Sequence, residues 1–168
     1  NTNIINEWIY KINSHIYKSV SNLTSKDRYC LKFDGCSKGN PGKAGIGAVV
    51  YKNNHEVWSN SKYIGVKTNN VSEYSAIILG LNAAKKLKID ELEVFGDSQL
   101  VINQINGIYK VKNDTLIPLY EMTNKLKKTF NSISFTHIYR NENKRADELA
   151  NIGLDDEVVY NPEIEDLD

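Results

Sequence analysis

The stretch Phe33–Val50, FDGCSKGNPGKAGIGAVV, starts as a strand, ends as a strand and has a glycine-rich turn between its two apolar parts. An acidic residue, Asp34, stands at the end of the first apolar run, where a sheet normally has Val or Ile. A single Asp before Gly35 can simply start a turn. A chemical role for Asp34 therefore depends on whether other carboxylates of the chain meet it.

The residues around this stretch predict three antiparallel strands, because only short loops separate the strand-like segments. Further along the chain, helical stripes alternate with short apolar strands, an order that implies parallel strands and right-handed crossovers. The predicted fold class is α/β, with a mixed five-stranded sheet (three antiparallel, then two parallel strands) flanked by helices. The expected strands are Arg28–Asp34, Ile46–Tyr51, Glu56–Ile64, Leu92–Phe95 and Ile133–Tyr139. The expected helices of this part are a first long helix with an apolar stripe from Tyr74 to Ala84, followed by Ser98–Asn106, Leu116–Phe130 and Asn143–Ile152.

Three segments are expected along the chain. Residues 1–27 form an N-terminal amphipathic helix and a linker, residues 28–154 form the main domain, and residues 155–168 form an acidic tail. The helix is indicated by apolar residues at helical spacing, namely Ile4, Ile5, Trp8, Ile9, Ile12 and Ile16. It can pack on the main domain, dimerise, or be the remnant of a targeting or upstream segment.

The net charge of zero hides an asymmetry along the chain. Seven of the 21 acidic residues follow Leu154, whereas none of the 21 basic residues does, so residues 1–154 carry a net charge of +7. A basic domain with an acidic tail suggests a polyanionic partner. A solvated surface with a disordered tail explains the same charges equally well.

The two cysteines and the absence of long apolar runs indicate the environment in which the protein works. Cys30 and Cys36, if both lie on one extended strand, are roughly 20 Å apart, whereas a disulfide needs Cα atoms within about 7 Å. We therefore expect two reduced thiols in an intracellular protein. No apolar run approaches the roughly 18 residues of a membrane span.

Four acidic residues stand out by position: Asp34 and Asp97 at the ends of two predicted strands, Glu73 at the start of the first long helix of the main domain, and Asp147 in the last helix. Each has an ordinary explanation. Asp34 can start a turn, Glu73 can complete a capping box with Asn70, Asp97 can cap the next helix, and Asp147 can be a surface acid. Against this, Glu73 and Asp147 both lie beside the apolar stripes of their helices.

The expected topology brings these acids together. Ligands of open α/β sheets gather at the carboxyl ends of strands, and if the strands of Asp34 and Asp97 are parallel neighbours, the two residues are roughly 5 Å apart. A divalent metal removes the repulsion between such close carboxylates. Oxygen ligands suit Mg²⁺, and three or four acids can hold two ions that cleave a phosphodiester bond.

The sequence resembles type 1 ribonuclease H in four motifs that occur in the family's order. They are Asp34-Gly35 with NPGKAGIG, TNNVSEYSAIILGL, FGDSQLVINQI and HIYRNENKRADELA, and they cover about residues 29–154. The resemblance implies a ribonuclease H-like fold and an endonuclease that cuts the RNA strand of RNA–DNA hybrids, leaving 3′-hydroxyl and 5′-phosphate ends. It also implies that Asp34, Glu73, Asp97 and Asp147 hold two Mg²⁺ ions, with Mn²⁺ as a substitute.

The resemblance also suggests accessory residues. His137, ten residues before Asp147, is similar to the family's mobile catalytic histidine; the alternative is a strand-end histidine without a catalytic task. Neutral amides suit recognition of the RNA 2′-hydroxyl. Asn40, Asn69 and Asn70 resemble the family's contacts to the RNA strand, and Thr68 and Asn103 resemble its contacts to DNA phosphates.

The chain departs from the bacterial pattern in the short segment 107–114, which lacks a long basic protrusion. We expect an RNA–DNA hybrid as the partner, without a membrane or an obligate protein partner. Two alternatives remain: a nuclease of the same fold that acts on double-stranded RNA or RNA–DNA junctions, and an inactive domain that binds nucleic acid or tethers another protein. The tail suggests a further hypothesis, that its acids compete with nucleic acid for the basic face.

Overall fold

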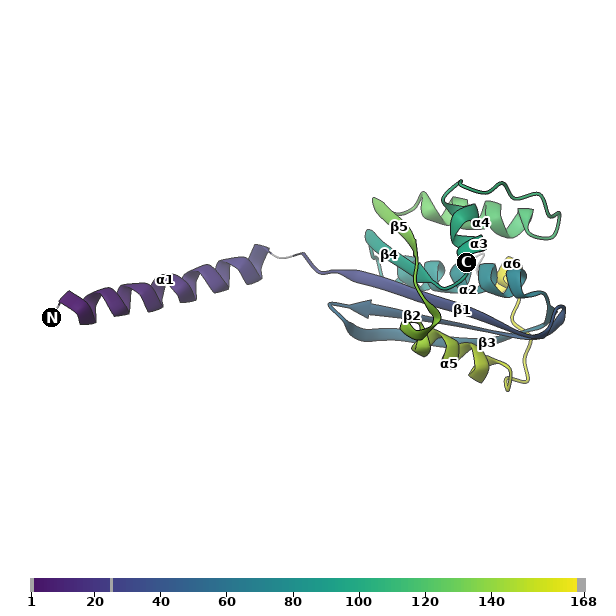
Figure 1. Cartoon of the computed structure of the whole chain (residues 1–168), viewed down its shortest axis with the longest axis horizontal. Coiled ribbons are helices and arrows are strands. Elements are labelled where there is room, and N and C mark those ends of the chain that lie inside the picture. Colours follow the sequence, from purple (N-terminus) through teal and green to yellow (C-terminus); the bar gives the residue numbers. More distant parts are fainter. Residues whose placement is uncertain (1, 25, 166–168) are drawn as a thin grey trace.

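One mixed sheet organises the chain, with the strand order β3-β2-β1-β4-β5 (Figure 1). In the computed structural model, residues 2–24 and 26–165 are described. The strands are β1 (Tyr29–Gly39), β2 (Gly42–Lys52), β3 (His55–Lys67), β4 (Glu91–Gly96) and β5 (Ser132–His137). β1, β2 and β3 pair antiparallel, and β4 runs parallel to both β1 and β5. The predicted fold class is confirmed.

The first two strands are longer than the sequence predicted. β1 and β2 stay paired from Tyr29 with Lys52 to Gly39 with Gly42, so the turn is confined to Asn40 and Pro41. The prediction that Asp34 ends its strand is therefore wrong, since Asp34 lies in the middle of β1. Glycine and polar residues weaken the strand signal of this segment, although a strand accepts them where another backbone approaches closely. The parallel pairing of β1 with β4, however, ends at Lys32, just before Asp34.

Helices cover both faces of the sheet (Figure 1). Alternate residues of β1 and β2, including Leu31, Phe33 and Ile46, are fully buried in the main hydrophobic core with residues of α2 and α4. On the opposite face, Val49 packs with Ala146 and Leu149 of α5. The helices are α1 (Thr2–Thr24), α2 (Asn69–Lys86), α3 (Gln99–Ile105), α4 (Ile117–Lys127), α5 (Lys144–Gly153) and α6 (Pro162–Glu165), and a short 3-10 helix, η1, spans Arg140–Glu142.

The two ends of the chain differ in how they meet the sheet. α1 projects away from the domain (Figure 1). The C-terminal segment returns to the edge strand β3: Val159 forms a bridge with Tyr63, and the Tyr160 amide donates a hydrogen bond to the Tyr63 carbonyl (2.7 Å). Tyr160 is buried. Part of the predicted acidic tail is thus attached to the domain, while residues 166–168 lie outside the described residues.

Two further expectations concern the state of the cysteines and membrane-spanning helices. Cys30 and Cys36 both lie on β1 and are free thiols, as predicted. None of the helices in the described part of the chain combines the length and the apolar character needed to cross a membrane.

Candidate active site

Three of the four predicted acids meet at one point. Asp34 comes from β1, Asp97 directly follows β4, and Glu73 comes from α2. Each offers a carboxylate oxygen, and these oxygens all lie within 4.8 Å of one another. The parallel pairing of β1 with β4 explains the approach of Asp34 and Asp97, because the β1–β4 ladder ends just before both residues. The structure thus contains a group of acids that can hold a metal ion.

The local geometry excludes the capping explanation for Glu73. Thr68 is the N-cap of α2, and its hydroxyl accepts a hydrogen bond from the Val71 amide (3.3 Å). Glu73 is therefore the fifth helical residue and lies beyond the position that a capping box uses. It is only 8% exposed, and its Oε2 has no hydrogen-bond partner among the described residues. A buried carboxylate oxygen without a partner is costly unless something else binds it.

Glycine at position 35 allows this helix to approach the strand. A Cβ on Gly35 would lie 2.5 Å from the carbonyl carbon of Ser72 and 2.6 Å from the amide nitrogen of Glu73. Such distances are too short for real contacts, so only glycine permits the backbone of α2 to lie this close to β1. The residue after Asp34 thereby places Glu73 beside it.

Asp97 is also not a helix cap. The residue that caps α3 is Ser98, whose hydroxyl accepts a hydrogen bond from the Val101 amide (3.4 Å). The carboxylate of Asp97 remains available at the end of β4. The ordinary explanations for Glu73 and Asp97 therefore both fail.

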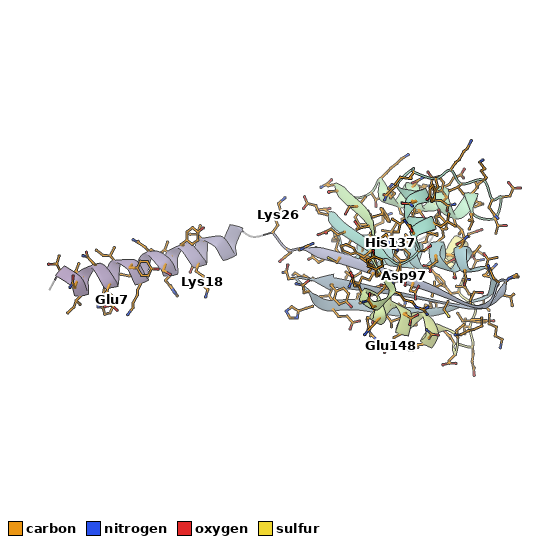
Figure 2. The ribbon with its side chains drawn as sticks, in the orientation of Figure 1. Glu7, Lys18, Lys26, Asp97, His137 and Glu148 are labelled. Carbon is orange, nitrogen blue, oxygen red and sulfur yellow. The ribbon has the colours of Figure 1, made fainter. Side chains whose placement is uncertain are left out.

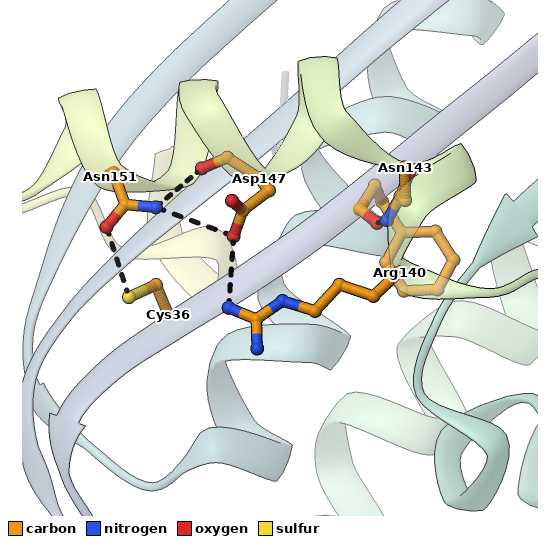
Figure 3. Close-up of polar contacts among 6 residues, drawn as sticks. Cys36, Arg140, Asn143, Asp147 and Asn151 are labelled. Carbon is orange, nitrogen blue, oxygen red and sulfur yellow. Dashed lines mark hydrogen bonds and ion pairs between the residues drawn. The ribbon is translucent and has the colours of Figure 1, made fainter.

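Asp147 lies in the first turn of α5, at the side of the three converging acids. Arg140 Nη2 lies 3.9 Å from its Oδ1, and Asn151 Nδ2 donates to its carbonyl oxygen (2.8 Å) and to Oδ1 (3.5 Å) (Figure 3). The Asn151 side chain in turn accepts a hydrogen bond from the Cys36 thiol of β1 (3.6 Å). Asp147 is thus held by its own helix and by the neighbouring 3-10 turn.

The electrostatics of the acids follow from their burial and proximity. Burial, with the charges of Asp97 and Asp147 beside it, raises the pKa of Asp34 from its ordinary 3.8 to about 8. Burial, with Asp34 and Asp97 nearby, also raises the pKa of Glu73 well above its ordinary value. Carboxyl groups that keep protons near neutral pH are typical of a site that lacks its counter-charge.

The four acids open into one cleft of about 540 Å³. Its walls also contain His137 at the end of β5, Tyr139 and Arg140. The side chains of Asp97 and His137 lie at the same part of the domain (Figure 2). The His137 ring packs edge to face against Tyr139, with 5.8 Å between the ring centroids. The structure therefore brings together all five residues predicted to be catalytic.

The comparisons with known proteins agree with this geometry. A family model described as reverse transcriptase-like matches residues 32–153. A ribonuclease H1 from Halobacterium salinarum has 40% sequence identity and a TM-score of 0.74, with 76% of this chain and 98% of that chain covered. The chain belongs to the type 1 ribonuclease H family.

Two more members of the ribonuclease H family are similar to the chain. The LC11 ribonuclease H1 from compost, solved in complex with an RNA/DNA hybrid, has 38% identity and a TM-score of 0.72, with 76% of this chain and 97% of that chain covered. A bifunctional protein of Mycobacterium tuberculosis is 44% identical over 127 residues, which are 74% of this chain but 35% of that protein. The chain thus spans about a third of the length of this mycobacterial relative.

The residues predicted to contact the substrate lie less close together than the five residues predicted to be catalytic. Of these residues, Asn69 lines the ribonuclease H cleft. Asn40 is joined to it, because the Asn40 Oδ1 accepts a hydrogen bond from the Asn69 amide (3.1 Å). Thr68 and Asn70 flank Asn69 at the start of α2, whereas Asn103 lies in α3 and does not line the cleft.

The sequence analysis missed two residues of the ribonuclease H site. The sequence carries no signal for Arg140, because only the fold shows that the 3-10 helix η1 reaches Asp147. Asn143 is the first residue of an expected helix, and the structure shows that it is fully buried and that its Nδ2 donates to the Phe33 carbonyl (2.9 Å). One asparagine among many carries no sequence signal for this role.

Proposed function

We propose that the chain is a metal-dependent endoribonuclease that hydrolyses the RNA strand of RNA–DNA hybrids and leaves 3′-hydroxyl and 5′-phosphate ends. The observation that carries the proposal is the convergence of Asp34, Glu73 and Asp97 within 4.8 Å, with Asp147 on the wall of the same cleft. The similarity to a ribonuclease H1 solved with an RNA/DNA hybrid supports the substrate. The activity is assigned to residues 28–154.

The donor set fits two Mg²⁺ ions, with Mn²⁺ as a substitute. All four side chains are carboxylates, and hard divalent cations prefer oxygen ligands. The Oε2 of Glu73, which has no hydrogen-bond partner in the described part of the chain, supports a cation in particular, because a positive charge would satisfy this buried oxygen. We assign Asp34, Glu73, Asp97 and Asp147 as ligands. Two such ions, when bound, activate the attacking water and stabilise the leaving oxygen.

The remaining residues of the cleft orient the substrate and move protons. His137, on the cleft wall, is assigned to proton transfer, since an imidazole ring can both accept and donate a proton. Arg140, which is 83% exposed and 3.9 Å from Asp147, is free to contact a phosphate of the scissile strand. These tasks follow from the position of each side chain around the four acids.

Recognition of the hybrid is assigned to amides and hydroxyls at the start of α2. The Asn40 oxygen accepts from the Asn69 backbone, which leaves its amide group to donate to an RNA 2′-hydroxyl. Asn69 and Asn70 are assigned to the RNA strand as well. Thr68 and Asn103 are assigned to phosphates of the DNA strand.

Two alternatives compete with this function. An inactive domain that binds nucleic acid or tethers another protein has no need for four carboxylates around one cleft, so the geometry disfavours it. A nuclease of the same fold that acts on double-stranded RNA or RNA–DNA junctions would use the same acids. We assign the protein to an intracellular setting on account of its two free thiols, with the hybrid as its partner and no obligate protein partner.

A cleavage assay with a separate label on each strand of a hybrid tests the proposal. Wild type in Mg²⁺ should cut only the RNA strand, and Asp97→Asn should cut neither strand while remaining folded. Asp114→Asn, which changes an exposed acid outside the cleft, serves as the control and should cut like wild type. Equal cleavage by wild type and Asp97→Asn, or no cleavage by wild type in Mg²⁺ or Mn²⁺, would refute the assignment. Double-stranded RNA and a junction substrate in parallel separate the alternatives.

A further inference from the structure

The N-terminal helix α1 carries an apolar stripe that the domain does not use. Ile5, Ile9, Ile12 and Ile16 follow one another at spacings of four, three and four residues along Thr2–Thr24. This is the heptad spacing with which one helix packs against another. A four-three alternation places all four isoleucines along one narrow seam of the helix.

This seam is exposed in the single chain. The four isoleucines are 51–58% exposed, and Ile4 and Trp8 beside them are 56% and 65% exposed. Neither hydrophobic core of the described residues includes a side chain of α1. The helix extends away from the domain (Figure 1), so the domain of the same chain does not cover the seam. A row of large apolar side chains of this kind marks an interaction surface.

The charges of α1 favour a second copy of the same helix as the partner. Its charged residues, Glu7, Lys11 and Lys18, lie on the side opposite the seam, and Glu7 and Lys11 form an ion pair with each other (3.1 Å). The positions that flank a heptad seam decide whether identical helices repel one another. In α1, Asn6, Trp8, Asn13 and His15 occupy these positions, so no Lys, Arg, Asp or Glu opposes pairing of identical helices.

The same charges argue against an anionic membrane surface as the partner. Helices that bind such surfaces carry many Lys or Arg residues on the polar face. α1 has only two lysines and no arginine along its 23 residues. The electrostatic attraction that would hold the helix to anionic lipids is therefore small.

We propose that α1 is a self-association element: the isoleucine seam of one chain packs against the same seam of a second copy, as a short coiled coil. The isoleucines at both core positions supply the packing, and Trp8 extends the apolar contact along one side. The free energy comes from burying apolar side chains that are about half exposed in the single chain. The proposal does not depend on the nuclease activity.

The oligomeric state of the full chain tests the proposal, with two double variants that differ only in the face they change. Ile9→Lys with Ile16→Lys adds two charges to the seam, and Tyr10→Lys with Tyr17→Lys adds the same two charges, at the same spacing, to the exposed far side. Lysine is a good helix former, so both variants keep the helix. Sedimentation equilibrium across a wide range of concentrations gives the mass of each protein.

We expect wild type and the tyrosine variant to have at least twice the chain mass of 19.1 kDa, and the isoleucine variant to have the mass of one chain. Wild type that stays monomeric at the highest concentration would overturn the proposal. Association that survives in the isoleucine variant would also overturn it, because another surface would then be responsible. Flotation with anionic vesicles completes the test. If wild type is monomeric and floats with the vesicles, while the isoleucine variant does not float, the seam binds a lipid surface instead of a second copy.

Discussion

Asn143 at the start of α5 donates a hydrogen bond from its side-chain amide to the carbonyl oxygen of Phe33 in β1 (2.9 Å). Phe33 precedes Asp34, and Asn143 lies one helical turn before Asp147. The bond therefore connects the backbones that carry two of the four acids, which come from the two ends of the domain sequence. Asn143 is fully buried, so this bond lies inside the domain, between α5 and β1.

The first prediction concerns this bond. Asn143→Ala leaves the Phe33 carbonyl without its partner and should lower the free energy of unfolding by about 1–3 kcal/mol. Because α5 then loses its attachment beside Asp34, cleavage of a hybrid should fall by about 10- to 100-fold. Urea unfolding and a cleavage assay measure the two effects. Asn141→Ala, on the exposed 3-10 turn, is the control and should change neither. Wild-type rates in Asn143→Ala would show that Asp147 does not depend on this bond.

The second prediction concerns pH and follows from the raised pKa of Asp34, about 8 instead of 3.8. Between these values the folded protein binds more protons than the unfolded chain, so its free energy of unfolding falls as the pH rises. Without divalent metal, the protein should thus be more stable at pH 5 than at pH 8. Asp34→Asn should flatten this dependence in part, since the raised pKa of Glu73 acts in the same direction.

Denaturant unfolding in the presence of a chelator, repeated over this pH range, measures the dependence. Asp114→Asn is the matched control, because Asp114 is exposed and lies outside the cleft. Added Mg²⁺ should stabilise wild type more at pH 8 than at pH 5, because protons compete with the metal for the same oxygens. A stability that rises from pH 5 to pH 8 in the chelator would contradict the raised pKa.

The third prediction concerns the packing of α5 on β2. A Cβ on Gly47 would lie 2.5 Å from the Ala150 amide nitrogen and 2.6 Å from the Ala146 carbonyl oxygen. Gly47→Ala should therefore push α5 off the sheet, lower the free energy of unfolding by about 1–3 kcal/mol, and reduce cleavage by moving Asp147. The control is Gly107→Ala, at a position with a φ of +78° and no atom within 4 Å of an added Cβ. It should lower stability through backbone strain alone and keep the wild-type rate per folded molecule.

The order of the elements and the four acids could be predicted because both depend on local patterns: apolar alternation, helical stripes and motif spacing. The sequence predicts Asp34 at a strand end instead of within β1, because glycine and polar residues conceal the second half of this strand. The roles of Arg140 and Asn143 depend on contacts between segments far apart in the sequence. No local pattern distinguishes a buried asparagine from the many exposed ones in this chain.

The last prediction concerns the C-terminal segment. Because this segment is attached to β3, the effect of its acidic residues on nucleic-acid binding cannot be tested by deleting it. Tyr160 is buried beside β3, and its ring lies 5.9 Å from the Lys62 ammonium group. Tyr160→Ala should lower the free energy of unfolding by about 3 kcal/mol, as for other large aromatic residues. Deletion of residues 155–168 would remove this side chain together with the acids, so a change in hybrid binding could come from lost stability alone.

Substitution of the exposed acids Asp155, Asp156 and Glu157 by their amides removes charge but keeps Tyr160. If the tail competes with nucleic acid for the basic face, this variant should bind a hybrid more tightly than wild type at low salt, and the gain should vanish at high salt. Binding of a catalytically inactive Asp97→Asn background, with and without the amide substitutions, measures the effect without cleavage. Unchanged affinity at low salt would show that these acids do not compete, whereas a loss of unfolding free energy in Tyr160→Ala would still establish the structural role of the segment.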